Sequence, residues 1–177
     1  MKKLLLLVVL MGISSISMAK TIYDFKYKDT DGKPLDFAQF KGKTLVIANI
    51  ATKCGFTGQL DDLEKVYNTY KDKGLVVVGI PSNNFLSQTP EDNKEVGNFC
   101  RLKYGVKFPI TEKVDVIGDN KTEVIKWINE QKGYEGTILW NFEKFIINRK
   151  GEVVDRFRSK TDPSDKDFIA AVEKALK

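Results

Sequence analysis

The sequence predicts an α/β fold in which helices flank a central mixed β-sheet, with a β-hairpin at the N-terminal end of the domain. Three observations predict this fold. Residues 21–37 alternate around an Asp-Gly pair, which is typical of a hairpin. Two apolar runs, 43–51 and 75–81, enclose a helical pattern. Two further strand patterns meet at 149–151 and are followed by an amphipathic helix.

The hairpin is predicted from TIYDFKYKDTDGKPLDF. Tyr23, Phe25 and Tyr27 occupy alternate positions and would share one face of a strand. Asp31 and Gly32 form the turn dipeptide, because glycine readily takes the positive φ that tight hairpin turns require. We therefore expect a hairpin ahead of the main sheet.

A β-α-β unit follows. KTLVIANIA and LVVVGIP are continuous apolar runs rich in β-branched residues, as in strands that are buried on both faces. Between them, QLDDLEKVYNTYKDKG carries apolar residues at helical spacing, and Gly74 is placed to end that helix. A unit of this length predicts two parallel neighbouring strands.

The second half of the chain predicts three more helices and an antiparallel pair. Thr89 and Pro90 indicate a helix start, and that helix would carry Cys100 and end near Gly105. A short helix is expected over 122–132, and strands on both sides of 149–151. The last helix is expected to begin with Asp162 as its cap. This order of elements is typical of a thioredoxin-like fold.

The first 19 residues have the pattern of a signal peptide. Two lysines precede an apolar stretch from Leu4, and Ser17-Met18-Ala19 supplies a small-x-small cleavage site. The stretch is shorter than the roughly 20 residues that span a bilayer, which disfavours the alternative of a membrane anchor. No cysteine follows the small residues, so nothing predicts a lipid anchor. We expect cleavage near Ala19, a single domain over 20–177, and a periplasmic or secreted protein.

Charge and composition narrow the classes of function. The chain has 29 basic and 24 acidic residues, and loss of the leader with its two lysines leaves a charge of +3. That is too small to predict nucleic-acid binding, and no basic run is present. Histidine is absent, which excludes Ser-His, Cys-His and His-zinc chemistry. We predict neither a metal nor a cofactor.

Cys54 is the residue that most suggests chemistry. It follows a buried strand and precedes a helix, where free N–H groups and the positive end of the helix dipole favour a thiolate. Gly55 permits close backbone approach, and Lys53 adds a nearby positive charge. The alternative is that Cys54 is a small buried core residue. Thr57 stands where a C-x-x-C exchanger has its second cysteine, which argues against that class.

Several motifs in sequence order resemble those of the glutathione peroxidase family. ATKCGFT at 51–57 resembles the motif of its peroxidatic cysteine or selenocysteine. GIPSNNFLSQTP at 79–90 resembles its glutamine-bearing loop, and WNFEKFIINRKGEVVDRF at 140–157 its Trp-Asn-Phe motif. The resemblance runs from about Tyr23 to the C-terminal helix. One departure is Leu86-Ser87, where many relatives have glycines.

This resemblance implies the functional residues and the reaction. It places the catalytic tetrad on Cys54, Gln88, Trp140 and Asn141, whose amides and indole are neutral hydrogen-bond donors. Cys100 resembles the resolving cysteine of the thioredoxin-dependent branch. Hydrogen peroxide and organic hydroperoxides, including lipid ones, would be reduced through a Cys54 sulfenic acid and a Cys54–Cys100 disulfide. A thioredoxin-like protein or glutathione would recycle the enzyme in a response to oxidative stress.

The resemblance also implies a conformational step and an assembly state. A disulfide needs its two Cα atoms within about 7 Å, so the helix that carries Cys100 would unwind locally if the cysteines lie farther apart. The short segment between the 122–132 helix and Trp140 resembles the monomeric branch.

Other classes fit the sequence less well. A peroxiredoxin with a Pro-x-x-x-Thr-x-x-Cys motif would need proline and threonine where Ile47 and Ala51 stand, and a copper chaperone of this fold would need histidine. The alternative from a different class is an exported, non-catalytic domain with a structural Cys54–Cys100 disulfide. Counting free thiols after treatment with peroxide distinguishes that protein from an enzyme.

Overall fold

A computed structural model describes residues 20–177 of the chain. The predicted leader, residues 1–19, lies outside the described residues. The main elements are β1 (Lys26–Lys28), β2 (Pro34–Asp36), β3 (Thr44–Ile50), α1 (Gln59–Tyr70), β4 (Leu75–Pro81), α2 (Asn93–Tyr104), α3 (Glu123–Asn129), β5 (Lys144–Ile147), β6 (Val153–Phe157) and α4 (Lys166–Ala175). No helix within 20–177 has both the length and the apolar character needed to cross a bilayer.

The central sheet is mixed, as the sequence predicts. Its strand order is β4-β3-β5-β6. β3 and β4 are parallel and joined through α1, whereas β5 is antiparallel to both β3 and β6. β3 is therefore the inner strand from which the chain leaves towards Cys54, and the start of β5 lies beside its last residues. This pairing brings the segments before β5 and after β3 to the same end of the sheet.

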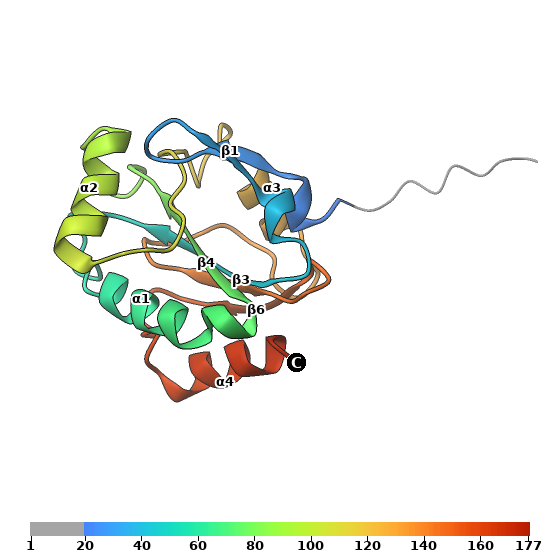
Figure 1. Ribbon diagram of the computed structural model, residues 1–177. Helices are drawn as coiled ribbons and strands as arrows, with labels where there is room; N and C mark the ends of the chain where they lie inside the picture. The colour runs from blue at the N-terminus through green and yellow to red at the C-terminus, as the bar shows by residue number, and fades with distance from the viewer. Residues whose placement is uncertain (1–19) are drawn as a thin grey trace, which may run out of the picture.

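Both faces of the sheet are covered, which explains why β3 reads as one continuous apolar run. Alternate β3 residues Val46, Ala48 and Ile50 pack on the side of α1, α2 and α4. Leu45 and Ile47 pack on the side of the hairpin and α3. Figure 1 shows α1 and α4 on one side of the sheet, with β1 and α3 on the other.

The N-terminal hairpin forms where the sequence predicts it. β1 pairs with β2 in antiparallel register, and Gly32 in the turn has φ of +81°. The prediction that Tyr23 and Phe25 lie in the first strand is wrong: Tyr23 is in a single 3-10 turn, Ile22–Asp24, Phe25 follows that turn, and only Tyr27 of the three is in β1. The hairpin is followed by a second 3-10 turn, Phe37–Phe40, whose phenylalanines enter the core.

Two predicted helix caps are wrong. α2 begins four residues after Thr89, with Asp92 as its N-cap: Asp92 accepts the Glu95 N–H and Glu95 accepts the Asp92 N–H. A carboxylate with this reciprocal partner satisfies two free N–H groups, which a lone hydroxyl further upstream cannot do. The N-cap position of α4 is likewise Asp165 rather than Asp162, which lies in the preceding turn and accepts the Ser164 N–H and hydroxyl.

Candidate active site

Cys54 lies in a series of tight turns between β3 and α1, rather than in the first turn of the helix itself. Thr57 fixes this turn: its Oγ1 accepts the Cys54 N–H at 3.0 Å and lies 2.7 Å from the Cys54 carbonyl oxygen. The Phe56 N–H donates to Cys54 Sγ at 3.4 Å. α1 begins only at Gln59. The group that donates to the sulfur is therefore the backbone N–H of Phe56 in the turn, and not an N–H group of helix α1.

Cys54 is buried, with 8% of the residue exposed. The neighbouring Lys53 does not leave an unopposed positive charge there. Its ammonium lies 3.3 Å from the carboxylate of Glu91, which also accepts the Thr52 hydroxyl at 2.6 Å. Burial acts to raise the pKa of Glu91, but these hydrogen bonds and the lysine charge hold it below its usual range.

The loop that carries Gln88 is tied directly to the cysteine turn. The Lys53 N–H donates to the Gln88 carbonyl oxygen at 2.9 Å. Leu86 and Ser87 have φ of +51° and +52°, the left-handed region that favours glycine. The departure noted in the sequence is therefore accommodated by two strained residues, each at a cost of order 1–3 kcal/mol. In this conformation Leu86 points outward and is 78% exposed, and the Gln88 carbonyl oxygen reaches the Lys53 N–H.

The structure brings Gln88 and Asn141 together from positions 53 residues apart. Asn141 is fully buried and donates its Nδ2 to Gln88 Oε1 at 3.0 Å. Asn141 Oδ1 is buried without a hydrogen-bond partner among the described residues. Trp140 is half-buried, and its ring packs against Phe85 with centroids 5.4 Å apart. Gln88, Trp140 and Asn141 thus form one group on the segments beside the end of β3.

Asn49 is a site residue that the sequence reasoning missed. Its Nδ2 donates to the Trp140 carbonyl oxygen at 3.3 Å, and its Oδ1 accepts the Glu143 N–H at 2.9 Å. The Phe142 N–H donates to the Asn49 carbonyl oxygen at 2.7 Å, and Phe142 has φ of +65°. Asn49 therefore holds the turn that presents Trp140 and Asn141. The signal in the sequence was a single amide inside an otherwise apolar strand.

An ion cluster around the buried Glu143 holds residues 134–139, the segment that precedes Trp140. Glu143 is fully buried and pairs with Arg156 at 2.9 Å and Arg158 at 2.8 Å. It also accepts the Leu139 N–H at 2.6 Å. Arg156 donates further to the backbone carbonyls of residues 134–137. Because a buried carboxylate is costly unless it is paired and hydrogen-bonded, this cluster fixes the segment that leads into Trp140.

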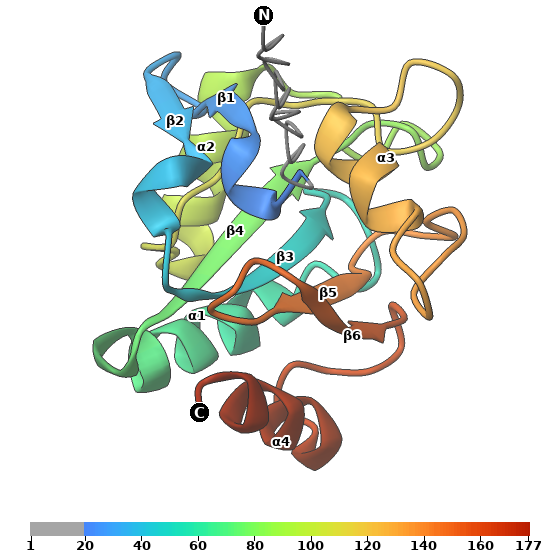
Figure 2. The same cartoon turned by 90° about the vertical axis from the view of Figure 1, so that its right-hand side faces the viewer.

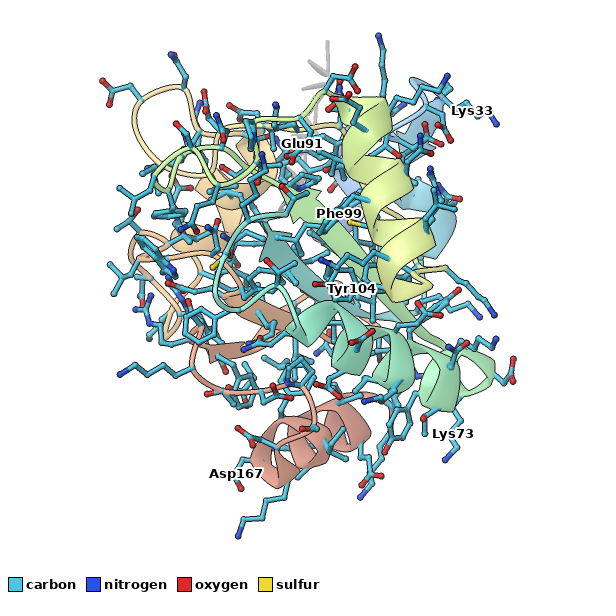
Figure 3. All side chains as sticks on the ribbon, turned by 90° about the vertical axis from the view of Figure 1, so that its left-hand side faces the viewer. Lys33, Lys73, Glu91, Phe99, Tyr104 and Asp167 are labelled. Atoms are coloured by element: carbon cyan, nitrogen blue, oxygen red, sulfur yellow. The ribbon has the colours of Figure 1, made fainter. Side chains whose placement is uncertain are left out.

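Cys100 lies in the second half of α2 and is only 1% exposed. Burial raises the pKa of its thiol to about 12. Both cysteines are free thiols and belong to one core cluster. Figure 3 looks onto α2, which carries Phe99 and Tyr104; their rings are tilted to one another, with centroids 5.5 Å apart. Cys100 is therefore shielded from solvent, and its thiol is protonated at neutral pH.

An apolar cavity of about 270 Å³ adjoins this site. It is lined by Phe56, Leu139, Trp140, Glu143, Arg158, Ser159 and Lys160. Phe56 follows Cys54 by two residues and Trp140 belongs to the group described above, so the cavity begins beside the reactive turn. Its basic rim comes from Arg158 and Lys160.

These features define a class. A single turn cysteine with threonine three residues on cannot act as a C-x-x-C dithiol, and the surrounding amides and indole suit a thiol that reacts alone. The fold is thioredoxin-like: a thiol:disulfide interchange protein of the thioredoxin family from Chlorobium tepidum matches with a TM-score of 0.67 and 25% identity, over 91% of this chain and all of that one.

The family follows from closer similarities. The sequence model of glutathione peroxidase matches residues 22–129. Glutathione peroxidase-like peroxiredoxin 2 of Saccharomyces cerevisiae is 46% identical over 154 residues, which are 85% of this chain and 94% of the yeast protein. The crystal structure of Trgpx in apo form matches with a TM-score of 0.69 and 35% identity, covering 88% of this chain and 97% of Trgpx. The chain belongs to the glutathione peroxidase family and is a peroxidase.

Proposed function

We propose that this peroxidase reduces hydrogen peroxide and organic hydroperoxides, including lipid hydroperoxides, by a two-cysteine mechanism. Cys54 is the peroxidatic residue, Cys100 resolves, and Gln88, Trp140 and Asn141 complete the catalytic group. One observation carries the proposal. The side chains of Gln88 and Asn141 are hydrogen-bonded at 3.0 Å, and the backbone of Gln88 is hydrogen-bonded to Lys53, the residue before Cys54.

In the first step the Cys54 thiolate attacks the outer oxygen of the hydroperoxide. The O–O bond breaks, the sulfur is oxidised to a sulfenic acid, and the other oxygen leaves as water or an alcohol after taking up a proton. The Phe56 N–H already donates to the sulfur. Asn141 engages the oxygen of the Gln88 amide, whose N–H₂ makes no hydrogen bond with residues 20–177 and can donate. Neutral donors of this kind support the anion without histidine.

In the second step the Cys100 thiolate attacks the Cys54 sulfur and a disulfide forms as water leaves. Cys100 cannot do this from the closed helix, because its thiol is buried and its pKa is about 12. Release of the second half of α2 exposes the thiol to water and removes the desolvation that keeps it protonated. Formation of the Cys54–Cys100 disulfide therefore requires local unwinding of α2.

The cavity beside Trp140 supports the choice of organic substrates. Its walls are largely apolar, and it starts next to Phe56, so the carbon chain of a hydroperoxide placed at Cys54 has a surface on which to lie. Hydrogen peroxide makes no use of this cavity. We expect the cavity to lower KM for organic hydroperoxides and to leave KM for hydrogen peroxide unchanged.

A thioredoxin-like protein is the proposed reductant, with glutathione as the alternative. A dithiol protein can attack the Cys54–Cys100 disulfide and leave both thiols reduced, by two exchange steps. The leader-like sequence at 1–19 supports an exported enzyme that works in the periplasm or outside the cell, as a monomer, in the response to oxidative stress.

Two cysteine variants test the mechanism. Cys54→Ser should abolish the fast reaction with peroxide, and Cys100→Ser should form the sulfenic acid at the normal rate without making a disulfide. Trapping the sulfenic acid and measuring intact mass distinguish the two steps. If both variants lose the first oxidation equally, the assigned roles are wrong. If the wild type keeps a disulfide that resists mild reductants and ignores peroxide, the protein is the non-catalytic domain.

The reductant is tested by steady-state turnover of one peroxide with a thioredoxin system and with glutathione. We expect turnover with the thioredoxin system in the wild type and none in Cys100→Ser, because only the intramolecular disulfide is its substrate. Faster turnover with glutathione than with thioredoxin, retained in Cys100→Ser, would contradict the two-cysteine cycle.

A further inference from the structure

A second cavity lies at the end of the sheet opposite to Cys54. It has a volume of about 580 Å³ and is lined by Tyr134, Asn148, Arg149, Lys150, Val153, Val154, Asp155, Ala171, Lys174, Ala175 and Lys177. β5 runs antiparallel to β3, so the loop after β5 lies beside the start of β3. Cys54 follows the end of β3, about 20 Å away along a seven-residue strand. The peroxidase site does not use this cavity.

The cavity has a fixed entrance. Arg149, at the tip of the β5–β6 hairpin, donates to the Leu176 carbonyl oxygen at 2.9 Å and to the Lys73 carbonyl oxygen at 2.9 Å. Figure 2 shows the hairpin on the same side of the molecule as the end of α4 that carries the C-terminus. Asn148 accepts the backbone N–H groups of Lys150 and Glu152, which shapes the hairpin turn. These bonds hold the backbone of the hairpin tip against the end of α4.

Charge around the cavity is one-sided. Four basic side chains line it, against one acidic side chain, Asp155, and the terminal carboxylate of Lys177. Within residues 20–177, no ion pair within 4.0 Å involves Arg149, Lys150, Lys174 or Lys177. Arg149 donates hydrogen bonds to the Leu176 carbonyl oxygen at the end of α4, where a positive charge stabilises the helix. The ammonium groups of Lys150 and Lys174 make no hydrogen bond with the described residues, so they can meet an anion.

The interior of the cavity is apolar. Val153, Val154, Ala171 and Ala175 carry no polar side-chain atoms, and the Tyr134 hydroxyl is already used by the Val154 carbonyl oxygen at 2.5 Å. The volume is within the range of about 300–1,000 Å³ that holds small ligands. A small inorganic anion would satisfy the rim and leave the interior empty. An apolar molecule without charge would leave the ammonium groups unpaired.

We propose that this cavity binds a single-chain fatty acid, with the carboxylate at Lys150 and Lys174 and the hydrocarbon chain against Val153, Val154 and Ala171. The lysine stems continue the apolar wall while their charged ends remain at the rim. The site is separate from the peroxidase centre and does not depend on the mechanism proposed for it. Binding is a simple association in which no bond is made or broken.

The experiment is calorimetric titration of the reduced, full-length chain with decanoate below its micelle concentration. We expect one decanoate per chain. Acetate, which has the head without the tail, and decylammonium, which reverses the charge, should each bind at least tenfold more weakly. The affinity for decanoate should fall on raising the NaCl concentration, because the rim charges are screened.

Two variants locate the ligand. Lys150→Ala combined with Lys174→Ala should weaken decanoate binding at least tenfold, and Ala171→Trp, which fills the interior, should do the same. The matched control, Lys41→Ala with Lys166→Ala, removes two exposed lysines outside the cavity and should leave affinity unchanged. Circular dichroism and the urea midpoint establish that each variant is folded.

The proposal has clear contrary results. Equal affinity for decanoate and decylammonium, or decanoate binding that survives both cavity variants, would overturn it. Decanoate that slows the oxidation of Cys54 by hydrogen peroxide equally in the wild type and the double lysine variant would place the ligand at the Trp140 cavity instead. The double lysine variant should itself react with hydrogen peroxide at the wild-type rate, so loss of this site is distinguishable from loss of the peroxidase.

Discussion

Replacing Arg101 with alanine tests how Cys100 reaches Cys54. Arg101 follows Cys100 in α2 and fastens that end of the helix to the N-terminal hairpin: its Nη2 donates to Thr30 Oγ1 at 3.0 Å and pairs with Asp31 at 3.3 Å. Arg101→Ala removes both contacts. If the second half of α2 must detach before Cys100 can react, the variant should form the Cys54–Cys100 disulfide faster than the wild type.

The size of the effect follows from the two contacts. A hydrogen bond contributes about 0.5–1.5 kcal/mol, and the half-exposed pair with Asp31 contributes about 0.2–1 kcal/mol after screening. A combined loss of about 1.4 kcal/mol shifts the opening equilibrium about tenfold. The sign of the effect is diagnostic, because the Arg101 charge also acts to lower the pKa of Cys100. In a reaction from the closed helix, Arg101→Ala would therefore slow the disulfide.

The assay mixes reduced protein with one equivalent of hydrogen peroxide, quenches with an alkylating agent, and follows sulfenic acid and disulfide by intact mass. Lys94→Ala is the matched control, since Lys94 is an exposed cation in the first turn of the same helix. The rate of sulfenic acid formation should be the same in all three proteins. An unchanged or slower disulfide step in Arg101→Ala would refute the unwinding mechanism.

Three further predictions follow from the packing. Asn49→Ala should slow the oxidation of Cys54 by peroxide at least tenfold and lower the free energy of unfolding by about 1–3 kcal/mol, because the turn bearing Trp140 loses its buried hydrogen bonds. Gly97→Ala should lower the urea midpoint, since the new Cβ would clash with the side chain of Thr30, with an expected cost of about 1–3 kcal/mol. Above pH 9 the unfolded chain releases the Cys100 proton while the folded chain keeps it up to about pH 12. The free energy of unfolding should therefore fall with pH by at most about 1.4 kcal/mol per unit in the wild type, and urea titrations of Cys100→Ala should lack that contribution.

The elements of the fold were predictable because their signals are local. The Asp-Gly turn at 31–32, the apolar runs of β3 and β4, and the amphipathic pattern of α1 each lie within one short window of the chain. The helix caps were not predictable in the same way. Thr89 and Asp162 are both acceptable caps by residue type, but the folded backbone starts α2 after Asp92, which exchanges hydrogen bonds with Glu95, and starts α4 after Asp165.

The candidate site divides similarly. The residue types at Cys54, Gln88, Trp140 and Asn141 and their order could be recognised from the sequence. Their arrangement could not, because Asn141 meets Gln88 only after β5 pairs with β3 in a particular register. The same pairing places Asn49 beneath the Trp140 turn.

The sequence by itself determined the α/β fold and the place of Cys54 between a strand and a helix, because backbone propensity and apolar periodicity are properties of neighbouring residues. Only the tertiary structure decided that Cys100 is buried and protonated, that Glu143 is neutralised by two arginines, and that a basic-rimmed cavity forms between the β5–β6 hairpin and α4. Burial and charge pairing join residues far apart in the chain, so they exist only once the strands are in register and the helices have docked.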